Sequence, residues 1–110
     1  PKGNPDKISA YAATNWGSYD ISGTSDLKGD DYEISHRGYD TRYVEQDPNR
    51  LVPVDVLREL EQANVVGEIH GHFIATSGLA NPLANSRRLG REIAQNLKDQ
   101  GVDAVILTST

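Results

Sequence analysis

The sequence predicts an α/β fold: an open sheet with parallel strands flanked by helices, and an N-terminal half rich in loops. Three observations predict it. Helix and strand patterns alternate over the second half of the chain, the closing run is apolar on both faces, and turn-forming residues dominate the opening residues. Because 110 residues is the length of one modest domain, we expect residues 1–110 to form a single α/β domain.

The first half of the chain has few regular patterns. Residues 1–31 are rich in Gly, Ser, Asn, Asp and Pro, which favour turns, so we expect ordered loop there. Residues 32–35 are compatible with a short strand. A polar corner follows at residues 36–40, where Gly38 permits a positive φ, and residues 47–50 read as a turn.

A helix is predicted over residues 53–64. Pro53 suits a first helical position, and Asp55 complements the positive end of the helix dipole. Apolar residues then repeat at helical spacing: Val56, Leu57, Leu60 and Ala63. A strand is predicted next, over residues 65–75.

A second helix is predicted from Asn81 to Gly101, with Leu89, Ile93 and Leu97 forming one apolar stripe. Residues 102–107 are apolar apart from Asp103, which is typical of a parallel strand covered on both faces. The order helix, strand, helix, strand is that of an α/β unit.

Composition excludes several classes of function. The net charge of -5, with no clustered basic stripe, argues against a nucleic acid partner. No apolar stretch approaches the roughly 20 residues of a membrane helix, and no signal peptide pattern opens the chain, so we expect a cytoplasmic protein. The absence of cysteine excludes disulfides, thiolate metal sites and thiol nucleophiles from this sequence.

The polar corner is a candidate substrate site. His36, Tyr39 and Asp40 place an imidazole, a phenol and a carboxylate within five residues, a set able to bind an ammonium or a carboxylate. His36 is a candidate proton donor to a departing amine, because a histidine pKa lies near neutrality. The alternative is a structural turn in which Asp40 accepts hydrogen bonds from nearby backbone amides.

The predicted strand at residues 65–75 carries further candidates. His70 and His72 alternate, so both project from one face, a spacing that two-histidine metal sites use, but no third ligand is evident. We therefore expect no metal, and a polar strand facing a cleft. Thr76 and Ser77 open a loop that can offer backbone amides to a substrate carboxylate; the alternative is an ordinary connection.

Aromatic and basic groups remain open to two interpretations. Trp16, with Tyr11 and Tyr19, is a candidate cage for a quaternary ammonium, whose attraction to each ring is roughly 0.5–2 kcal/mol; packing against a sheet is the alternative. A basic cluster on the second predicted helix either is a solvent-exposed face or contacts the acidic surface of a partner. Its members are Arg87, Arg88 and Arg91.

Several stretches of the chain resemble a known family. They are Pro-Lys-Gly-Asn-Pro-Asp at 1–6, Gly-Tyr-Asp at 38–40, Asp-Pro-Asn-Arg at 47–50 and Pro-Val-Asp-Val-Leu-Arg-Glu at 53–59. Together they are similar to the selenoprotein B subunit of glycine, sarcosine and betaine reductases, to which D-proline reductase is more distantly related. Residues 101–110 resemble the segment that runs directly into a selenocysteine-x-x-cysteine motif in that family.

The resemblance implies an expected function. The family reductively cleaves the carbon–nitrogen bond of the amine, with thioredoxin as reductant, and the B subunit binds the substrate. Its other components are a pyruvoyl-bearing partner, a second selenoprotein and a component that forms acetyl phosphate. We expect this chain to be an interior fragment that stops just before the selenocysteine, with no cofactor of its own and no redox activity alone. The family pattern matches His70 but has an aromatic residue at position 72, which favours His70.

The expected position of the selenocysteine adds two candidates. Ligands of open α/β sheets bind outside the carboxyl ends of the strands, so Thr108 and Ser109 would supply hydroxyls beside the selenolate. A following helix N-terminus would lower its proton affinity. The alternative is that these residues simply end a strand. A rival function is a non-catalytic α/β binding module for a small zwitterion or a partner protein.

Overall fold

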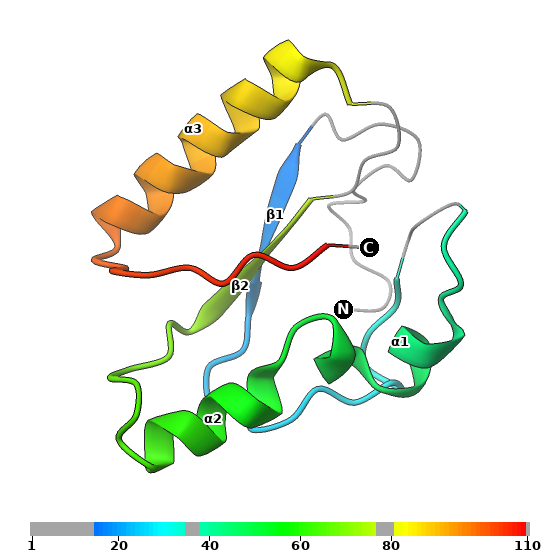
Figure 1. Cartoon of the computed structure of the whole chain (residues 1–110), viewed down its shortest axis with the longest axis vertical. Coiled ribbons are helices and arrows are strands. Elements are labelled where there is room, and N and C mark those ends of the chain that lie inside the picture. Colours follow the sequence, from blue (N-terminus) through cyan, green and yellow to red (C-terminus); the bar gives the residue numbers. More distant parts are fainter. Residues whose placement is uncertain (1–14, 35–37, 77–80, 110) are drawn as a thin grey trace.

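The computed structural model describes residues 15–34, 38–76 and 81–109, and within them one two-stranded sheet and three α-helices. Figure 1 shows their arrangement. In chain order the elements are β1 (Trp16–Asp20), α1 (Arg42–Gln46), the 3₁₀ turn η1 (Pro48–Arg50), α2 (Val54–Gln62), β2 (His72–Thr76) and α3 (Leu83–Asp99). No helix in these ranges is long and apolar enough to cross a membrane.

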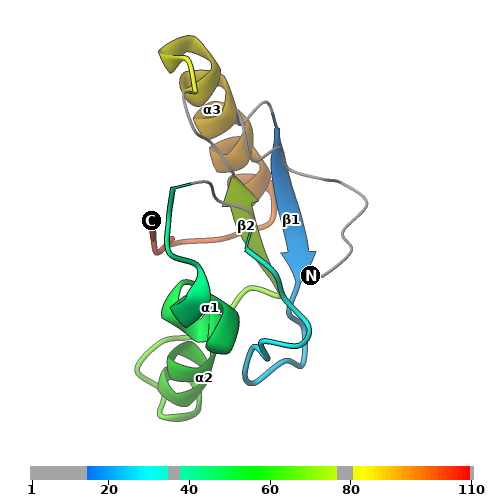
Figure 2. The ribbon, with the colours of Figure 1, turned by 90° about the vertical axis from the view of Figure 1, so that its right-hand side faces the viewer.

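The two strands are antiparallel. Trp16 lies opposite Thr76 at one end of the sheet, and Asp20 lies opposite His72 at the other. One more hydrogen bond continues the ladder, because the Ile21 N–H donates to the Gly71 carbonyl at 2.8 Å. Helix α3 lies toward one end of the sheet, and α1 and α2 lie toward the other (Figures 1 and 2).

A small apolar core joins the sheet to the loops and to α2. Its fully buried members are Ile21, Leu27 and Val54, which are 4%, 2% and 1% exposed. Tyr32, Val52 and Phe73 pack around them. The Phe73 ring lies 5.2 Å from that of Tyr19 and 6.3 Å from that of Tyr32, as measured between centroids. Three buried side chains are too few to fix the surrounding loops alone.

The Asn49 side chain fixes the loop that carries Leu27. Its Oδ1 accepts the Leu27 N–H at 3.1 Å, and its Nδ2 donates to the Leu27 carbonyl at 3.1 Å. The same Nδ2 donates to Asp26 at 2.7 Å and to Asp47 at 3.1 Å. Because this buried amide satisfies both backbone groups of Leu27, it joins η1 to a loop more than twenty residues away.

Arg58 and Glu61 form a second polar connection. It joins α2 to the loop after β1 and to the loop before β2. The Arg58 guanidinium donates to the carbonyls of Thr24 (3.0 Å) and Ile21 (3.2 Å). It also donates to Glu61 at 2.9 Å, and Glu61 in turn accepts the Ile69 N–H at 2.7 Å. The Ile69 amide, and next the Arg58 guanidinium, hold the pKa of Glu61 below its usual value.

Both long helices predicted from the sequence are confirmed. The helix expected over 53–64 is α2, and the one expected from Asn81 to Gly101 is α3, with Leu89 buried and Ile93 and Leu97 half-buried. The turn at 47–50 is η1, in which the Asp47 side chain accepts the Asn49 N–H. The buried face of α2 differs in detail, because Val54 is buried and Val56 is 49% exposed.

The expected sheet is only partly present. The mixed class of helices and strands is confirmed, but the sheet is antiparallel, and β1 lies in a region predicted as loop. The strand predicted over 65–75 is limited to β2 at 72–76. Asn64 has a φ of 57°, in the left-handed region; bends follow at residues 65–67, and residues 68–70 have no regular structure. No strand forms at Tyr32, Glu33 and Ile34.

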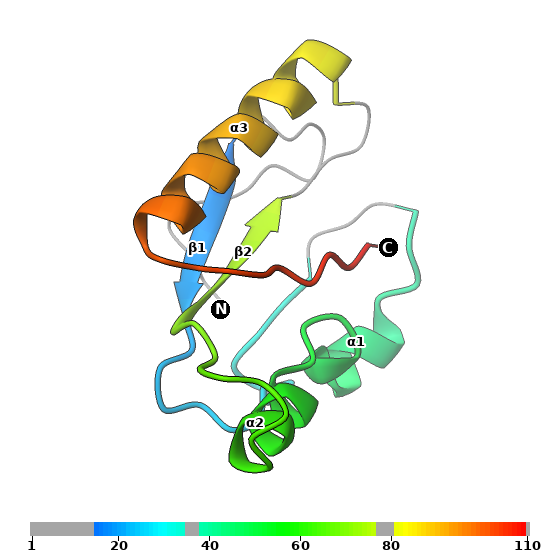
Figure 3. The ribbon, with the colours of Figure 1, turned by 60° about the vertical axis from the view of Figure 1, so that its left-hand side comes forward.

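The prediction of a strand at 102–107 is wrong for the described structure. The segment is extended but has no ladder partner, and Val105, Ile106 and Leu107 are 56%, 62% and 90% exposed. Figures 1 and 3 show it crossing the face of the sheet rather than continuing the sheet at an edge. A strand pattern in sequence needs a paired neighbouring edge before it becomes a strand, and no described residue pairs with this segment.

Replacing Asn49 by alanine should lower the free energy of unfolding by roughly 2–4 kcal/mol, because both backbone groups of Leu27 lose their partner in a buried site. Asn49→Asp should destabilise more at pH 7 than at pH 4, since it places a third carboxylate beside Asp26 and Asp47. Urea unfolding at the two pH values measures both effects. Gln62→Ala, at an exposed position, is the control; an equal loss there would contradict the role of Asn49.

Acid should weaken the connection between Glu61 and Ile69. A carboxylate whose pKa is depressed on folding contributes stability that is present above its unfolded value, 4.5 for this group, and is lost as the pH falls through the folded pKa. Glu61→Gln keeps an acceptor for the Ile69 N–H but cannot titrate. Hydrogen exchange of the Ile69 amide should therefore accelerate on acidification in the wild type, relative to its intrinsic rate, and not in the variant. Glu59→Gln, exposed on the same helix, should behave as wild type.

Candidate functional site

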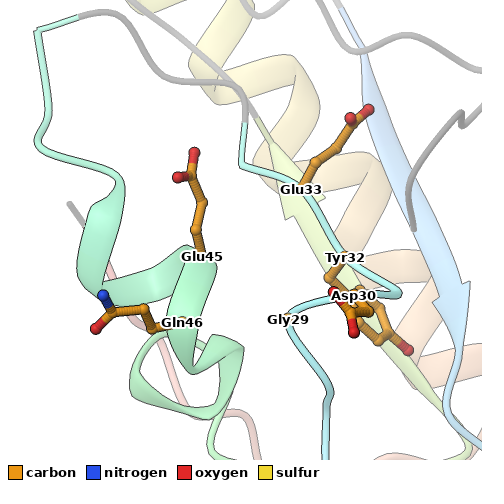
Figure 4. A pocket seen from close by; sticks show the side chains of 6 residues that line it. All are labelled: Gly29, Asp30, Tyr32, Glu33, Glu45 and Gln46. Atoms are coloured by element: carbon orange, nitrogen blue, oxygen red, sulfur yellow. The ribbon is translucent and has the colours of Figure 1, made fainter.

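A cavity of about 460 Å³, open to solvent, lies between the loop before α1 and α1 itself. Its lining residues are Gly29, Asp30, Tyr32, Glu33, Glu45 and Gln46. Figure 4 shows Glu33 and Glu45 on opposite sides of this opening, the first from the loop and the second from α1. We call it the acidic pocket.

The loop reaches α1 closely because residue 29 is glycine. A Cβ atom at this position would collide with the Glu45 carbonyl oxygen, so a larger residue would push the loop away from the helix. Tyr32 connects the pocket to the core through its ring contact with Phe73. Burial, followed by the nearby charges of Asp31 and Asp20, raises the pKa of Tyr32, which keeps its phenol neutral.

The charge of the pocket selects its ligand class. Three carboxylates line it, those of Asp30, Glu33 and Glu45, together with one aromatic ring and one amide. Carboxylates accept charge-assisted hydrogen bonds from ammonium groups, and an aromatic face attracts cations. The arrangement therefore suits a small cation with a positively charged nitrogen.

A second cavity, of about 210 Å³, is structural in character. It is lined by Ser22, Gly23, Arg58, Glu61, Glu68, Ile69 and Gly71. Its two central charged groups, Arg58 and Glu61, are engaged with each other and with backbone groups of the sheet loops. They hold the fold together and are poorly placed to exchange those contacts for a ligand.

At the polar corner, the described residues adopt the structural turn. Asp40 is paired with Arg42, with Nη2–Oδ2 and Nε–Oδ1 distances of 2.6 and 2.9 Å, and it also accepts the Arg42 N–H. The Arg42 side chain, and then its backbone N–H, lower the pKa of Asp40. Gly38 has the positive φ that its position suggested, and Tyr39 is partly exposed. His36 lies outside the described residues.

His70, which precedes β2, and His72, which begins it, are neighbours. Their ring centroids are 5.8 Å apart; His70 is half-buried, and His72 is exposed opposite Asp20. Within residues 15–34, 38–76 and 81–109, no group of three or more His, Cys, Asp or Glu side chains is placed to hold a metal ion. His70 stays a candidate for substrate contact.

The sheet brings Trp16 close to Thr76 and separates Trp16 from Tyr19. Trp16 and Thr76 are cross-strand partners, and the Trp16 indole N–H donates to Glu92 of α3 at 3.3 Å. Trp16 and Tyr19 are three residues apart on one strand, so their side chains project from opposite faces, and Tyr19 contacts Phe73 instead. These two rings do not line one cage. Tyr11 and Ser77 lie outside the described residues.

The remaining candidates are on the surface. Thr108 and Ser109 are exposed at the end of the described chain. Arg87 and Arg91 are exposed on α3, as expected for a solvated face, whereas Arg88 forms an ion pair with Glu92 at 2.7 Å and donates to Asn85.

Sequence reasoning missed the acidic pocket. Asp30, Asp31 and Glu33 surround Tyr32 in four residues, and that density of carboxylates around an aromatic was the available signal. The sequence around Glu45 gave no such signal, because Glu45 reaches the pocket only when α1 packs against the loop at Gly29.

Comparison with known proteins places this chain in a family. The family model for glycine/sarcosine/betaine reductase selenoprotein B matches residues 1–110. The glycine reductase complex component B subunit gamma of Carboxydothermus hydrogenoformans is 49% identical over the whole chain. The sarcosine and betaine reductase complex component B subunits beta of Peptoclostridium acidaminophilum are 43% and 42% identical, also over the whole chain.

The more distant relationship is confirmed as well. The D-proline reductase subunit gamma of Acetoanaerobium sticklandii is 36% identical over 87 residues, which are 76% of this chain and 35% of that subunit. No solved structure matches. The chain spans about a quarter of the length of the glycine, sarcosine and betaine reductase subunits it matches, 25% in each case. From the match over its whole length, the chain belongs to the selenoprotein B family of glycine, sarcosine and betaine reductases.

Proposed function

We propose that this chain is part of the substrate-binding B component of a reductase that cleaves the carbon–nitrogen bond of glycine, sarcosine or betaine. The observation that carries this proposal is the unbroken match of residues 1–110 to B subunits named for all three amines. Because the chain spans a quarter of those subunits, the proposed activity belongs to the longer polypeptide and its complex.

We assign the positively charged nitrogen of the substrate to the acidic pocket. Glycine, sarcosine and betaine differ only in N-methylation, and all three have a cationic nitrogen beside a carboxylate. The carboxylates of Asp30, Glu33 and Glu45 complement that charge. The Tyr32 ring supplies a face for the methyl groups of betaine, whose nitrogen has no N–H to donate.

The redox part of the reaction is assigned outside this chain. We propose a selenocysteine after Thr110, a pyruvoyl group on a partner component, and thioredoxin as the reductant, in a cytoplasmic complex. Thr108 and Ser109 would then stand beside the selenolate. The parallel open sheet expected from the sequence remains a prediction for the full-length subunit.

A binding module without chemistry is the second candidate. It is supported by the sequence, which contains no cysteine and therefore no thiol of its own. In this alternative, the acidic pocket binds a small zwitterion or a basic group of a partner protein, and no electron transfer follows.

Removing charge from the acidic pocket should weaken amine binding. In the full-length protein, Glu33→Gln and Glu45→Gln should each lower the affinity for glycine, sarcosine and betaine about tenfold, because each removes an attraction worth roughly 1–2 kcal/mol near a protein surface. Isothermal titration calorimetry with the three amines measures this. Glu59→Gln, on the exposed face of α2, is the charge-matched control and should bind as wild type.

The same titration tests the other candidates. If Trp16 or His36 contacts the substrate, Trp16→Ala should weaken betaine binding most and His36→Ala should weaken all three. Unchanged affinity in both variants would remove these residues from the site. Unchanged affinity in the Glu33 and Glu45 variants would remove the acidic pocket from it.

The gene offers a test that needs no protein. If the chain is an interior part of a selenoprotein B subunit, the reading frame after the Thr110 codon should continue through an in-frame UGA into a selenocysteine-x-x-cysteine motif. Sequencing past that codon gives the answer. A sense codon or an ordinary stop with no such motif beyond it would favour the binding module.

A further inference from the structure

Residues 102–107, which we call the C-terminal apolar segment, expose an unusual amount of apolar surface. Three consecutive side chains, Val105, Ile106 and Leu107, are 56%, 62% and 90% exposed. Single exposed apolar residues are ordinary on a protein surface, but a contiguous run of large ones marks a surface that another element covers.

The backbone of this segment also has few partners among the described residues. The Val102 N–H donates to the Leu97 carbonyl at 3.0 Å, which completes the end of α3. Beyond it, no hydrogen bond is recorded from residues 103–109 to any other residue in the described ranges. An extended segment with β-branched residues, whose N–H and carbonyl groups are unpaired within the described part of the chain, resembles a strand without its neighbours.

Strand β2 has a matching free edge. Among the described residues it pairs with β1 alone, and a two-stranded sheet is only marginally stable in water. Helix α3, 17 residues long, connects β2 to the C-terminal apolar segment. A connection of a dozen or more residues is what parallel strands of one sheet require.

We propose that the C-terminal apolar segment is an inner strand of a larger sheet and docks against a part of the same polypeptide outside these 110 residues. In the full-length subunit we expect one edge to pair in parallel with β2 and the other to accept a strand from that outside part, so that the segment runs along the sheet and no longer across its face. The subunits that match this chain are about four times its length, so the family has the chain length to supply these neighbours.

The side-chain pattern favours this occupant over a second copy of the chain. Successive strand residues point to opposite faces, so Val105 and Leu107 face one way and Ala104 and Ile106 the other. Asp103 lies on the same face as Val105 and Leu107, but from residue 104 onward both faces are apolar and both need cover, as in a strand between two layers of helices. A symmetric contact between two copies along the free edge would cover one edge and leave both faces exposed.

Hydrogen exchange of the full-length protein, read by mass spectrometry, tests this proposal. The amides of residues 103–107 should exchange on the order of a thousandfold or more slowly than in an unstructured peptide of the same sequence, because an inner strand opens only with large-scale unfolding. The protection should not depend on protein concentration. Fast exchange would overturn the proposal, and protection that appears only as dimers form would assign the surface to a second copy instead.

A pair of matched variants separates burial from a general effect of charge. Ile106→Asp should lower the unfolding temperature of the full-length protein and abolish protection across 103–107. Val65→Asp introduces the same group at a residue that is 68% exposed in a turn, and should change neither. Equal effects of the two variants would contradict the proposal. Amine binding plays no part in these measurements, so their outcome is independent of the proposed function.

Discussion

The fold depends on two sets of polar contacts, which hold the loops in place where the apolar core is too small to do so. Only Ile21, Leu27 and Val54 form the buried cluster, and the loop from 21 to 34 has no regular structure to hold it. The Asn49 amide binds the backbone of Leu27, and the Arg58 guanidinium binds the carbonyls at the two ends of the turn after β1. These side chains satisfy backbone groups that a sheet or helix would otherwise satisfy, which is why a loop-rich half can adopt one conformation.

The acidic pocket is a consequence of that arrangement. Its loop wall follows directly after Leu27, and its helical wall is α1, which immediately precedes η1 and Asn49. The amide of Asn49 therefore holds both walls at a fixed separation. Neighbouring residues therefore have different parts in the proposed site: asparagine sets the geometry, and the carboxylates supply the charge.

The long amphipathic helices could be predicted from the sequence because their signals are local. A proline at the start, an apolar stripe and a terminal glycine are all read within twenty residues, and α2 and α3 follow them closely. The strands could not be predicted in this way, because a strand forms only when a partner distant in sequence supplies its hydrogen bonds. Trp16 to Asp20 resembles a loop until β2 is placed beside it, and residues 102–107 resemble a strand although no described residue pairs with them. The same reason hid the acidic pocket, in which Glu45 and Glu33 meet only through tertiary structure. The turn at Asp40, by contrast, was one of two alternatives that the sequence left open, and the hydrogen bond from the Arg42 backbone N–H to Asp40 corresponds to the structural one.

The contact between Trp16 and Glu92 has a spectroscopic consequence. Trp16 is the single tryptophan of the sequence, and its indole N–H is the group that meets α3 from the sheet. Its emission wavelength depends on how polar its surroundings are and on whether the carboxylate remains beside the ring. Movement of α3 away from β1 would therefore change the fluorescence contributed by this chain, so that one optical signal reports whether helix and sheet are still joined.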